Sequence, residues 1–297
     1  MTSNPLPVYF APVQGSTDLP YRVIHHNAVG GVDAYYTPFL RWEPGGLRNK
    51  DRHDIDPDAN RGIPTVVQLI ANRRDEFARL LDAVEEARWR RIDLNAGCAF
   101  PMQVHAGRGC ALLQRPEALR ELFDEMRRRP EVEFSVKMRL GWESADEVLT
   151  LLPLINDSPV SLVTMHPRIG KRQMKDKPDL DAFGRFLTHC QKPVVYNGDL
   201  TSVGDIHRIA NLFPSIAGVM IGRGLLANPL LGLAYRDGTA FDEAARMRTL
   251  RLMASQLRAA VRQHLANEGQ VQQRMQAFWT YQKGLIPKQE YKQLMRE

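Results

Sequence analysis

The sequence has few of the features that mark secreted, membrane or zinc-binding proteins. Its three cysteines, Cys98, Cys110 and Cys190, fit neither a disulfide framework nor the spacing of a zinc finger. No uninterrupted apolar run reaches the roughly 18 residues that a membrane helix requires. The N-terminus lacks the basic start and the apolar core of a signal peptide. We therefore expect a cytoplasmic protein with reduced thiols, no membrane segment and no bound metal.

Net charge is absent from most of the chain. Lys and Arg total 40 and Asp and Glu total 34, which gives +6 over 297 residues. Residues 243–297 hold ten basic and four acidic residues, so residues 1–242 are neutral overall. This asymmetry predicts two parts with different tasks, residues 1–242 and residues 243–297. The basic C-terminal part would suit a polyanionic partner.

Short apolar runs recur along residues 1–242, and a helical pattern follows each of them. The runs are rich in Val, Ile, Leu and Met and mostly do not alternate, which is typical of parallel strands buried on both faces. Eight such units in about 240 residues predict an α/β fold, a TIM (β/α)8 barrel. The expected strands are Val8–Val13, Ala34–Phe39, Thr65–Ile70, Ile92–Asn95, Glu133–Arg139, Leu162–His166, Pro193–Asn197 and Gly218–Ile221.

A doubly wound open sheet is the structural alternative. Such a sheet usually has a glycine-rich fingerprint after its first strand, and the turn Ala11–Gly15 lacks one. The strand pattern then stops near Asp242. The apolar residues from Met247 to Leu265 predict one long helix, which Asn267–Gly269 would end. Further short helices over Val271–Gly284 and Gln289–Met295 would complete a small C-terminal α-helical domain.

Polar residues follow the apolar runs at the positions where an active site is expected. In a TIM barrel the catalytic residues lie at the C-terminal ends of the strands. All the strand ends would meet at one mouth, so these residues are candidates for one site. They are Gln68, Asn95–Cys98, Lys137, Arg139, His166, Arg168, Asn197–Asp199 and Gly222–Gly224.

The last two clusters predict a phosphate site. Loops after strands seven and eight form the usual phosphate site of this fold. Gly222 and Gly224 would let backbone N–H groups approach an anion, and Arg223 would add a guanidinium fork. The simpler interpretation is that these are ordinary turn glycines. The presence of both clusters at adjacent strand ends favours phosphate binding.

Lys137 and Arg139 would face the same side of one strand because side chains alternate. Two cations pointing into the barrel mouth would suit an anionic cofactor or substrate, whereas the alternative is that they reach the solvent edge of the helix layer. Cys98 follows a strand end, which favours a chemical role. Cys110 and Cys190 are interpreted as small buried apolar residues.

Taken together, these strand-end motifs resemble those of the tRNA-dihydrouridine synthase family. The motifs occur in family order over about residues 8–235, and Leu140–Trp142 after Lys137 is most similar to the C-type subgroup. Ala99–Phe100 follow Cys98 where the family usually has proline. The matching segments are Ala11–Asp18 with Arg22, Asn95–Cys98, Lys137–Trp142, His166–Arg168, Asn197–Asp199 and Val219–Gly224.

The resemblance implies an oxidoreductase with FMN as cofactor, NADPH as reductant and tRNA as substrate, acting as a monomer. It implies that Cys98 is the catalytic acid, donating a proton to uridine C5 as hydride reaches C6. It assigns Asn95, Arg139 and Arg168 to the substrate. It assigns to FMN the residues Ala11, Pro12, Val13, Gln68, Lys137, His166, Asn197, Gly198, Asp199, Gly222 and Arg223.

Two other functions share parts of this pattern. A flavin barrel oxidoreductase of the dihydroorotate dehydrogenase or old-yellow-enzyme kind would use the same cofactor site on a small molecule, but it would not need the basic C-terminal part. A barrel that binds RNA without catalysis would need the basic part and not the flavin. The presence of bound flavin and the dependence of activity on RNA distinguish the three.

Overall fold

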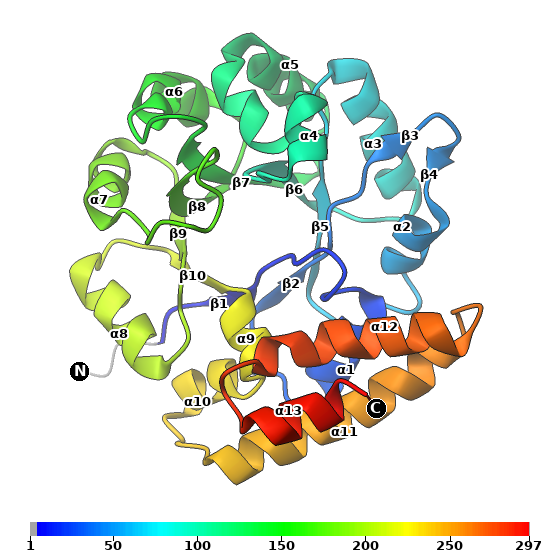
Figure 1. The fold of residues 1–297 in the computed structure, drawn as a ribbon. Coiled ribbons are helices and arrows are strands. Elements are labelled where there is room, and N and C mark those ends of the chain that lie inside the picture. Colours follow the sequence, from blue (N-terminus) through cyan, green and yellow to red (C-terminus); the bar gives the residue numbers. More distant parts are fainter. Residues whose placement is uncertain (1–4, 297) are drawn as a thin grey trace.

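The computed structural model describes residues 5–296, and its centre is a closed barrel of eight parallel strands (Figure 1). The strand order is β1-β10-β9-β8-β7-β6-β5-β2. The TIM barrel prediction is therefore confirmed, and the open-sheet alternative is excluded because a closed sheet has no edge strand. The strands are β1 Val8–Phe10, β2 Ala34–Tyr36, β5 Thr65–Leu69, β6 Arg91–Ala96, β7 Glu133–Gly141, β8 Leu162–Ile169, β9 Val194–Asn197 and β10 Gly218–Ile221.

The strand lengths differ from the predicted ones for local reasons. β1 and β2 have three residues each and end just before Pro12 and Pro38, which lack the N–H that a ladder needs. β7 and β8 are longer than predicted, and their pairing shifts register between Arg139 and Gly141. A small antiparallel hairpin, β3 Trp42–Glu43 and β4 Gly46–Leu47, was not predicted.

Helices surround the barrel and bury the apolar stripes that the sequence shows. Phe77, Leu80, Leu81 and Val84 of α3 are fully buried. Ser202 caps α8 through a reciprocal capping box with Asp205. The helices of this layer are α1 Leu19–Ala28, α2 Asn49–Asp54, α3 Arg74–Glu86, α4 Pro101–His105, η1 Gly109–Gln114, α5 Pro116–Arg127, α6 Glu147–Asp157, α7 Leu180–His189, α8 Val203–Leu212, α9 Arg223–Ala227 and α10 Leu231–Asp237.

The C-terminal residues form a helical layer that lies against α1 and the last barrel helices (Figure 1). It consists of α11 Glu243–Arg262, α12 Glu268–Trp279, η2 Thr280–Gln282 and α13 Lys288–Leu294. The second helix begins earlier than predicted because Asn267 is its N-cap: the Asn267 side-chain oxygen accepts from the Gln270 N–H at 3.0 Å. Within residues 5–296, no helix combines the length and the apolar character needed to cross a bilayer.

The C-terminal helices and the barrel share one hydrophobic cluster. Leu250 and Met253 of α11 and Phe278 of α12 belong to the same buried cluster as the side chains around the barrel. The Phe278 ring lies 6.1 Å from the ring of Tyr21 on α1, measured between centroids. Removing the C-terminal helices would therefore expose part of the core, so tests of this layer require point substitutions.

The shared cluster predicts that a cavity at Phe278 destabilises the whole chain. We expect Phe278→Ala to lower the free energy of unfolding by about 3–5 kcal/mol, as for other large-to-small changes at buried aromatic sites. Leu252→Ala is the matched control because Leu252 is an exposed side chain of the neighbouring α11, and it should change stability by less than about 0.5 kcal/mol. Urea denaturation would measure both. A barrel transition that Phe278→Ala leaves in place would show that the two parts unfold independently.

Candidate active site

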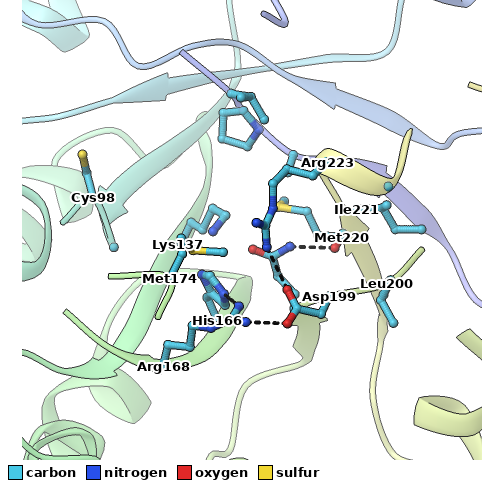
Figure 2. A pocket seen from close by; sticks show the side chains of 18 of the residues that line it. Cys98, Lys137, His166, Arg168, Met174, Asp199, Leu200, Met220, Ile221 and Arg223 are labelled. Carbon is cyan, nitrogen blue, oxygen red and sulfur yellow. Dashed lines mark hydrogen bonds and ion pairs between the residues drawn. The ribbon is translucent and has the colours of Figure 1, made fainter. Parts of the chain in front are cut away.

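A cavity of about 740 Å³ opens at the C-terminal ends of the barrel strands (Figure 2). This size is typical of a site for a cofactor or small molecule. The structure brings all fifteen residues predicted for the site to its wall, while their individual roles remain predictions. They are Ala11, Pro12, Val13, Gln68, Asn95, Cys98, Lys137, Arg139, His166, Arg168, Asn197, Gly198, Asp199, Gly222 and Arg223.

The sequence did not reveal several other residues of the wall, among them Gln14, Phe39, Met174 and Tyr281. Tyr281 belongs to η2 in the C-terminal layer, and its hydroxyl lies 2.9 Å from the hydroxyl of Ser16 in the loop after β1. The two residues are 265 positions apart, so no local pattern could have placed Tyr281 at the cavity. The C-terminal layer thus contributes directly to the site.

A chain of buried polar side chains crosses the barrel interior under the cavity. The Asp93 carboxylate accepts from Ser135 Oγ at 2.6 Å and from Gln68 Nε2 at 2.7 Å, and burial raises the pKa of Asp93 to about 6. Gln68 Oε1 in turn accepts from Asn95 Nδ2 at 2.8 Å. Since Gln68 and Asn95 come from neighbouring strands β5 and β6, this chain fixes the orientation of both amides.

Asn95 also holds the loop that carries Cys98. Its Oδ1 accepts from the N–H groups of Gly97 and Cys98, at 3.1 and 2.8 Å. The carbonyl of Cys98 accepts from the Cys110 N–H at 3.0 Å, and the Cys110 thiol donates to the carbonyl of Gly97 at 3.1 Å. Cys110 is therefore a buried support of the loop. The hydrogen bonds of Asn95 within the described chain use one of its two amide N–H donors.

The Cys98 thiol is half-buried at the cavity wall. Burial raises the pKa of Cys98 above its ordinary value, while the Phe100 N–H, Arg139 and Lys137 oppose that shift. The side chain is consequently a neutral thiol near neutral pH. A thiol in this state can give a proton to a carbon or oxygen that becomes negatively charged.

Lys137 lies between Cys98 and the Asp199–Arg223 pair in Figure 2. Burial, followed by the nearby charge of Arg139, lowers the pKa of Lys137 to about 8, although Asp93 opposes this. Arg139 is buried as well, but the oxygen atoms that accept from its guanidinium belong to backbone carbonyls and not to carboxylates. Its guanidinium donates to the carbonyls of Gly97 at 3.0 Å, Ile169 at 3.1 Å and Gln173 at 2.6 Å.

His166 is a neutral acceptor in this cationic environment. Arg168 Nη1 lies 2.7 Å from His166 Nε2, and because a guanidinium can only donate, the proton of the imidazole sits on Nδ1. Burial, with Lys137 next in effect, holds the pKa of His166 well below its usual range. Asp199 pairs with Arg168 and also with Arg223, at 2.8 Å from the latter. This carboxylate fixes both guanidinium groups (Figure 2).

The two glycine-containing loops meet at the ends of β9 and β10. Asn197 Nδ2 donates to the carbonyl of Met220 at 2.7 Å and joins the two strand ends. A Cβ on Gly224 would overlap the carbonyl oxygen of Leu200, so only glycine allows these loops to lie this close. Gly222 precedes α9, whose first N–H groups have no partner within the helix.

Two polar clusters tie the C-terminal layer to the loops around the cavity. Arg274 of α12 forms a bidentate pair with Asp18, at 2.7 and 3.1 Å, and donates to the carbonyl of Ser16 at 3.0 Å. Arg246 of α11 donates to the carbonyl of Ala227, at the end of α9, at 2.7 Å, and to Gln282. The layer therefore holds both the loop after β1 and the helix after β10.

Metal ligands do not gather in the described part of the chain: residues 5–296 contain no group of three His, Cys, Asp or Glu side chains placed to hold an ion. The cavity instead combines a thiol, buried cations and backbone N–H groups. This chemistry suits an anionic ligand and proton transfer.

Comparison with known structures shows a shared barrel. Morphinone reductase superimposes with a TM-score of 0.57 at 11% identity, over 83% of this chain and 93% of that one. Histamine dehydrogenase from Rhizobium sp. 4-9 gives a TM-score of 0.59 at 13% identity, over 78% of this chain and 45% of that one. At these identities the likeness establishes the fold alone.

Sequence comparison identifies relatives by function. The chain is 27% identical to a tRNA-dihydrouridine(16) synthase of Cupriavidus necator, over 80% of this chain and 76% of that protein. It is also 27% identical to the tRNA-dihydrouridine(20a/20b) synthase [NAD(P)+] of Saccharomyces cerevisiae, over 75% of this chain and 61% of that protein. The model of the dihydrouridine synthase family matches residues 9–297. The chain therefore belongs to the dihydrouridine synthase family.

Proposed function

We propose that the cavity binds FMN and that the protein uses NADPH to reduce the C5–C6 double bond of a uridine in tRNA. Family membership supplies the reaction class, an oxidoreductase that forms dihydrouridine. The observation that carries the residue roles is the meeting, in one cavity, of a neutral thiol with buried cations and glycine loops. An enzyme for this reaction needs an acid, an anion site and room for a flat cofactor.

The residues present fit a flavin phosphate and ring. The glycine loops at Gly222 and Gly224 with Arg223 form an anion site at the ends of β9 and β10, where this fold usually binds phosphate. Lys137 and the neutral His166 would lie near the ring, and the Gln68 amide, held by Asp93 and Asn95, would meet it from β5. The loop Ala11–Val13 after β1 supplies the remaining backbone contacts.

When bound, the flavin supplies a hydride for uracil C6, and the protein orients the reactants and manages charge. Hydride addition at C6 leaves negative charge on C5 and O4, so an acid must deliver a proton to C5. Cys98 is that acid: its loop is fixed by Asn95 and its thiol is protonated near neutral pH. Asn95, Arg139 and Arg168 hold the uracil or shape the walls around it.

The C-terminal layer supplies part of the grip on RNA. Ion pairs occupy several of its basic side chains, among them Arg246, Arg251, Arg262 and Arg274. Lys283, Lys288 and Lys292 are exposed. Lys283 follows the cavity residue Tyr281 by two positions, and Lys288 and Lys292 share a face of α13 at i, i+4 spacing. We assign the phosphate contacts to these three lysines.

Substitution of the proposed acid tests the mechanism. Cys98→Ala should keep bound flavin and its reduction by NADPH, while dihydrouridine formation falls by about 10²- to 10⁴-fold, the usual contribution of a positioned acid. Rapid-mixing absorbance would follow flavin reduction, and mass spectrometry of digested tRNA would follow the product. Cys190→Ala is the control because Cys190 lies at the opposite end of the barrel strands, before β9. A wild-type product rate in Cys98→Ala would remove the acid role.

The lowered pKa of Lys137 predicts how cofactor binding depends on pH. The charged form of Lys137 favours an anionic flavin, and it is lost as pH rises through about 8 in the free protein. FMN affinity should therefore be constant below about pH 7 and fall by up to about tenfold per pH unit above 8. In that higher range, the binding of FMN should be accompanied by proton uptake. Fluorescence titration of FMN into apoprotein measures this. Lys137→Met should bind weakly at all pH values, and a fall that persists in this variant would assign the titration to another group.

Neutralising the three exposed lysines tests the RNA assignment. The triple variant Lys283→Gln, Lys288→Gln, Lys292→Gln should bind an unmodified tRNA transcript more weakly, and the slope of log affinity against log salt should fall by about 3, near 0.9 per phosphate contact. The matched control is the triple variant Arg79→Gln, Arg120→Gln, Arg128→Gln. These residues lie on α3, on α5 and at the C-cap of α5, on the far side of the barrel (Figure 1). Equal slopes in the two triple variants would place the phosphate contacts elsewhere.

A further inference from the structure

Large apolar side chains are exposed beside the cavity mouth. Phe100 and Met102 are 60% and 59% exposed, the highest values among the exposed large apolar residues of the described chain. Both lie at the start of α4, directly after Cys98 and Ala99, which line the cavity. Met174, 41% exposed, belongs to the cavity wall itself. Exposed apolar side chains thus occur in the cavity wall and in the segment that directly follows it.

The local structure holds Phe100 and Met102 outward. The Phe100 carbonyl accepts from the N–H groups of Gln103 and Val104, at 2.9 and 3.1 Å, so Phe100 forms the N-terminal boundary of α4. Gln103 is buried, which turns the face with Met102 to solvent. Since Asn95 and Cys110 fix the preceding loop, the exposed side chains sit on a rigid support.

A second loop meets this segment. Arg41 Nη1 lies 3.8 Å from Met102 Sδ, and Arg41 Nε pairs with Glu43 Oε1 at 2.6 Å. Arg41 follows Phe39, which lines the cavity, just as Met102 follows Cys98 and Ala99. The contact therefore joins two segments that each begin in the cavity wall. We call Phe100, Met102 and Arg41 the α4 rim.

The fold itself does not use the apolar area of the rim, which is solvated in the free protein. Large apolar side chains that are exposed together beside a candidate active site point to a binding surface. Under the proposed function, the uridine must leave its stack to enter the cavity, and this leaves a neighbouring base with an uncovered face. An aromatic ring is the preferred partner of an unstacked RNA base, and the polarisable Met sulfur suits the same contact.

We propose that the α4 rim is a stacking platform for an unpaired base next to the uridine that enters the cavity. Phe100 supplies the ring, and Met102, held by Arg41, extends the surface. This inference rests on the proposed function and deepens it, because it adds a contact to RNA bases on the cysteine side of the mouth, distinct from the phosphate contacts of the C-terminal layer.

Kinetics on an unmodified tRNA transcript test the platform. Phe100→Ala should raise KM for the transcript and lower kcat/KM by about tenfold or more, the loss of one stacked base. Reduction of the bound flavin by NADPH should be unchanged, since that step involves no RNA. Phe100→Trp should restore kcat/KM, because its ring offers the same stacking face. Leu212→Ala is the matched control: Leu212 is 54% exposed but ends α8, away from the cavity mouth.

Fluorescence gives a readout independent of turnover. In Phe100→Trp, emission beyond that of the four native tryptophans should be quenched when the transcript binds, whereas a Leu212→Trp variant should show no added quenching. Unquenched emission at position 100, or equal kcat/KM for Phe100→Ala and Leu212→Ala while wild type forms dihydrouridine, overturns the platform alone. Wild-type protein that forms no dihydrouridine in tRNA overturns the proposed function and the platform with it.

Discussion

The site depends on positive charge that is buried at the barrel mouth without equal negative charge. Lys137 and Arg139 share one face of β7, and Arg168 lies on the next strand. Within the described chain, Asp199 is the carboxylate that pairs with cavity guanidinium groups, and it serves both Arg168 and Arg223. Arg139 donates hydrogen bonds to backbone carbonyls, which hold the cation in place but do not neutralise its charge. A cavity built this way favours anions and penalises protonation of His166, and both effects suit a phosphorylated cofactor.

The second constraint is the polar chain that runs from Asp93 through Gln68 to Asn95. Because Asn95 fixes the Cys98 loop and Gln68 lines the cavity, one hydrogen-bonded unit positions both the thiol and this part of the wall. A change at Gln68 would therefore disturb the cysteine loop as well as the cavity wall. Hydrogen bonds between the members of this polar chain offset the cost of burying their polar groups, which explains why the barrel interior accepts polar side chains at this level.

The basic residues of the C-terminal layer fall into two groups, which a count of charges does not distinguish. Arg246 and Arg274 have buried or half-buried side chains and anchor the layer to the loops after β10 and β1, so their charge contributes to structure. The exposed Lys283, which follows η2, and the exposed Lys288 and Lys292 of α13 are the residues that we propose for a polyanion. Tyr281 reaches the cavity wall from the same layer, so under the proposed function a polyanion bound to the layer would lie next to the cavity.

Local signals in the sequence were sufficient for the barrel and for the residues at the strand ends that line the cavity, because the strand ends of this fold converge at one mouth. Local signals were insufficient where a contact joins distant segments, or where the role of a residue depends on its exposure to solvent. Tyr281 meets Ser16 across 265 residues, and Asn95 shows its role as a loop support only once its partners are placed. Phe100 is the clearest case. In the sequence Phe100 is one apolar residue in a loop, indistinguishable from a residue of the hydrophobic core. In the structure its side chain is exposed to solvent, two residues after Cys98. Packing in the core does not explain an aromatic side chain held rigidly in that position, so the inferred contact with a base rests on the three-dimensional arrangement and not on any sequence pattern.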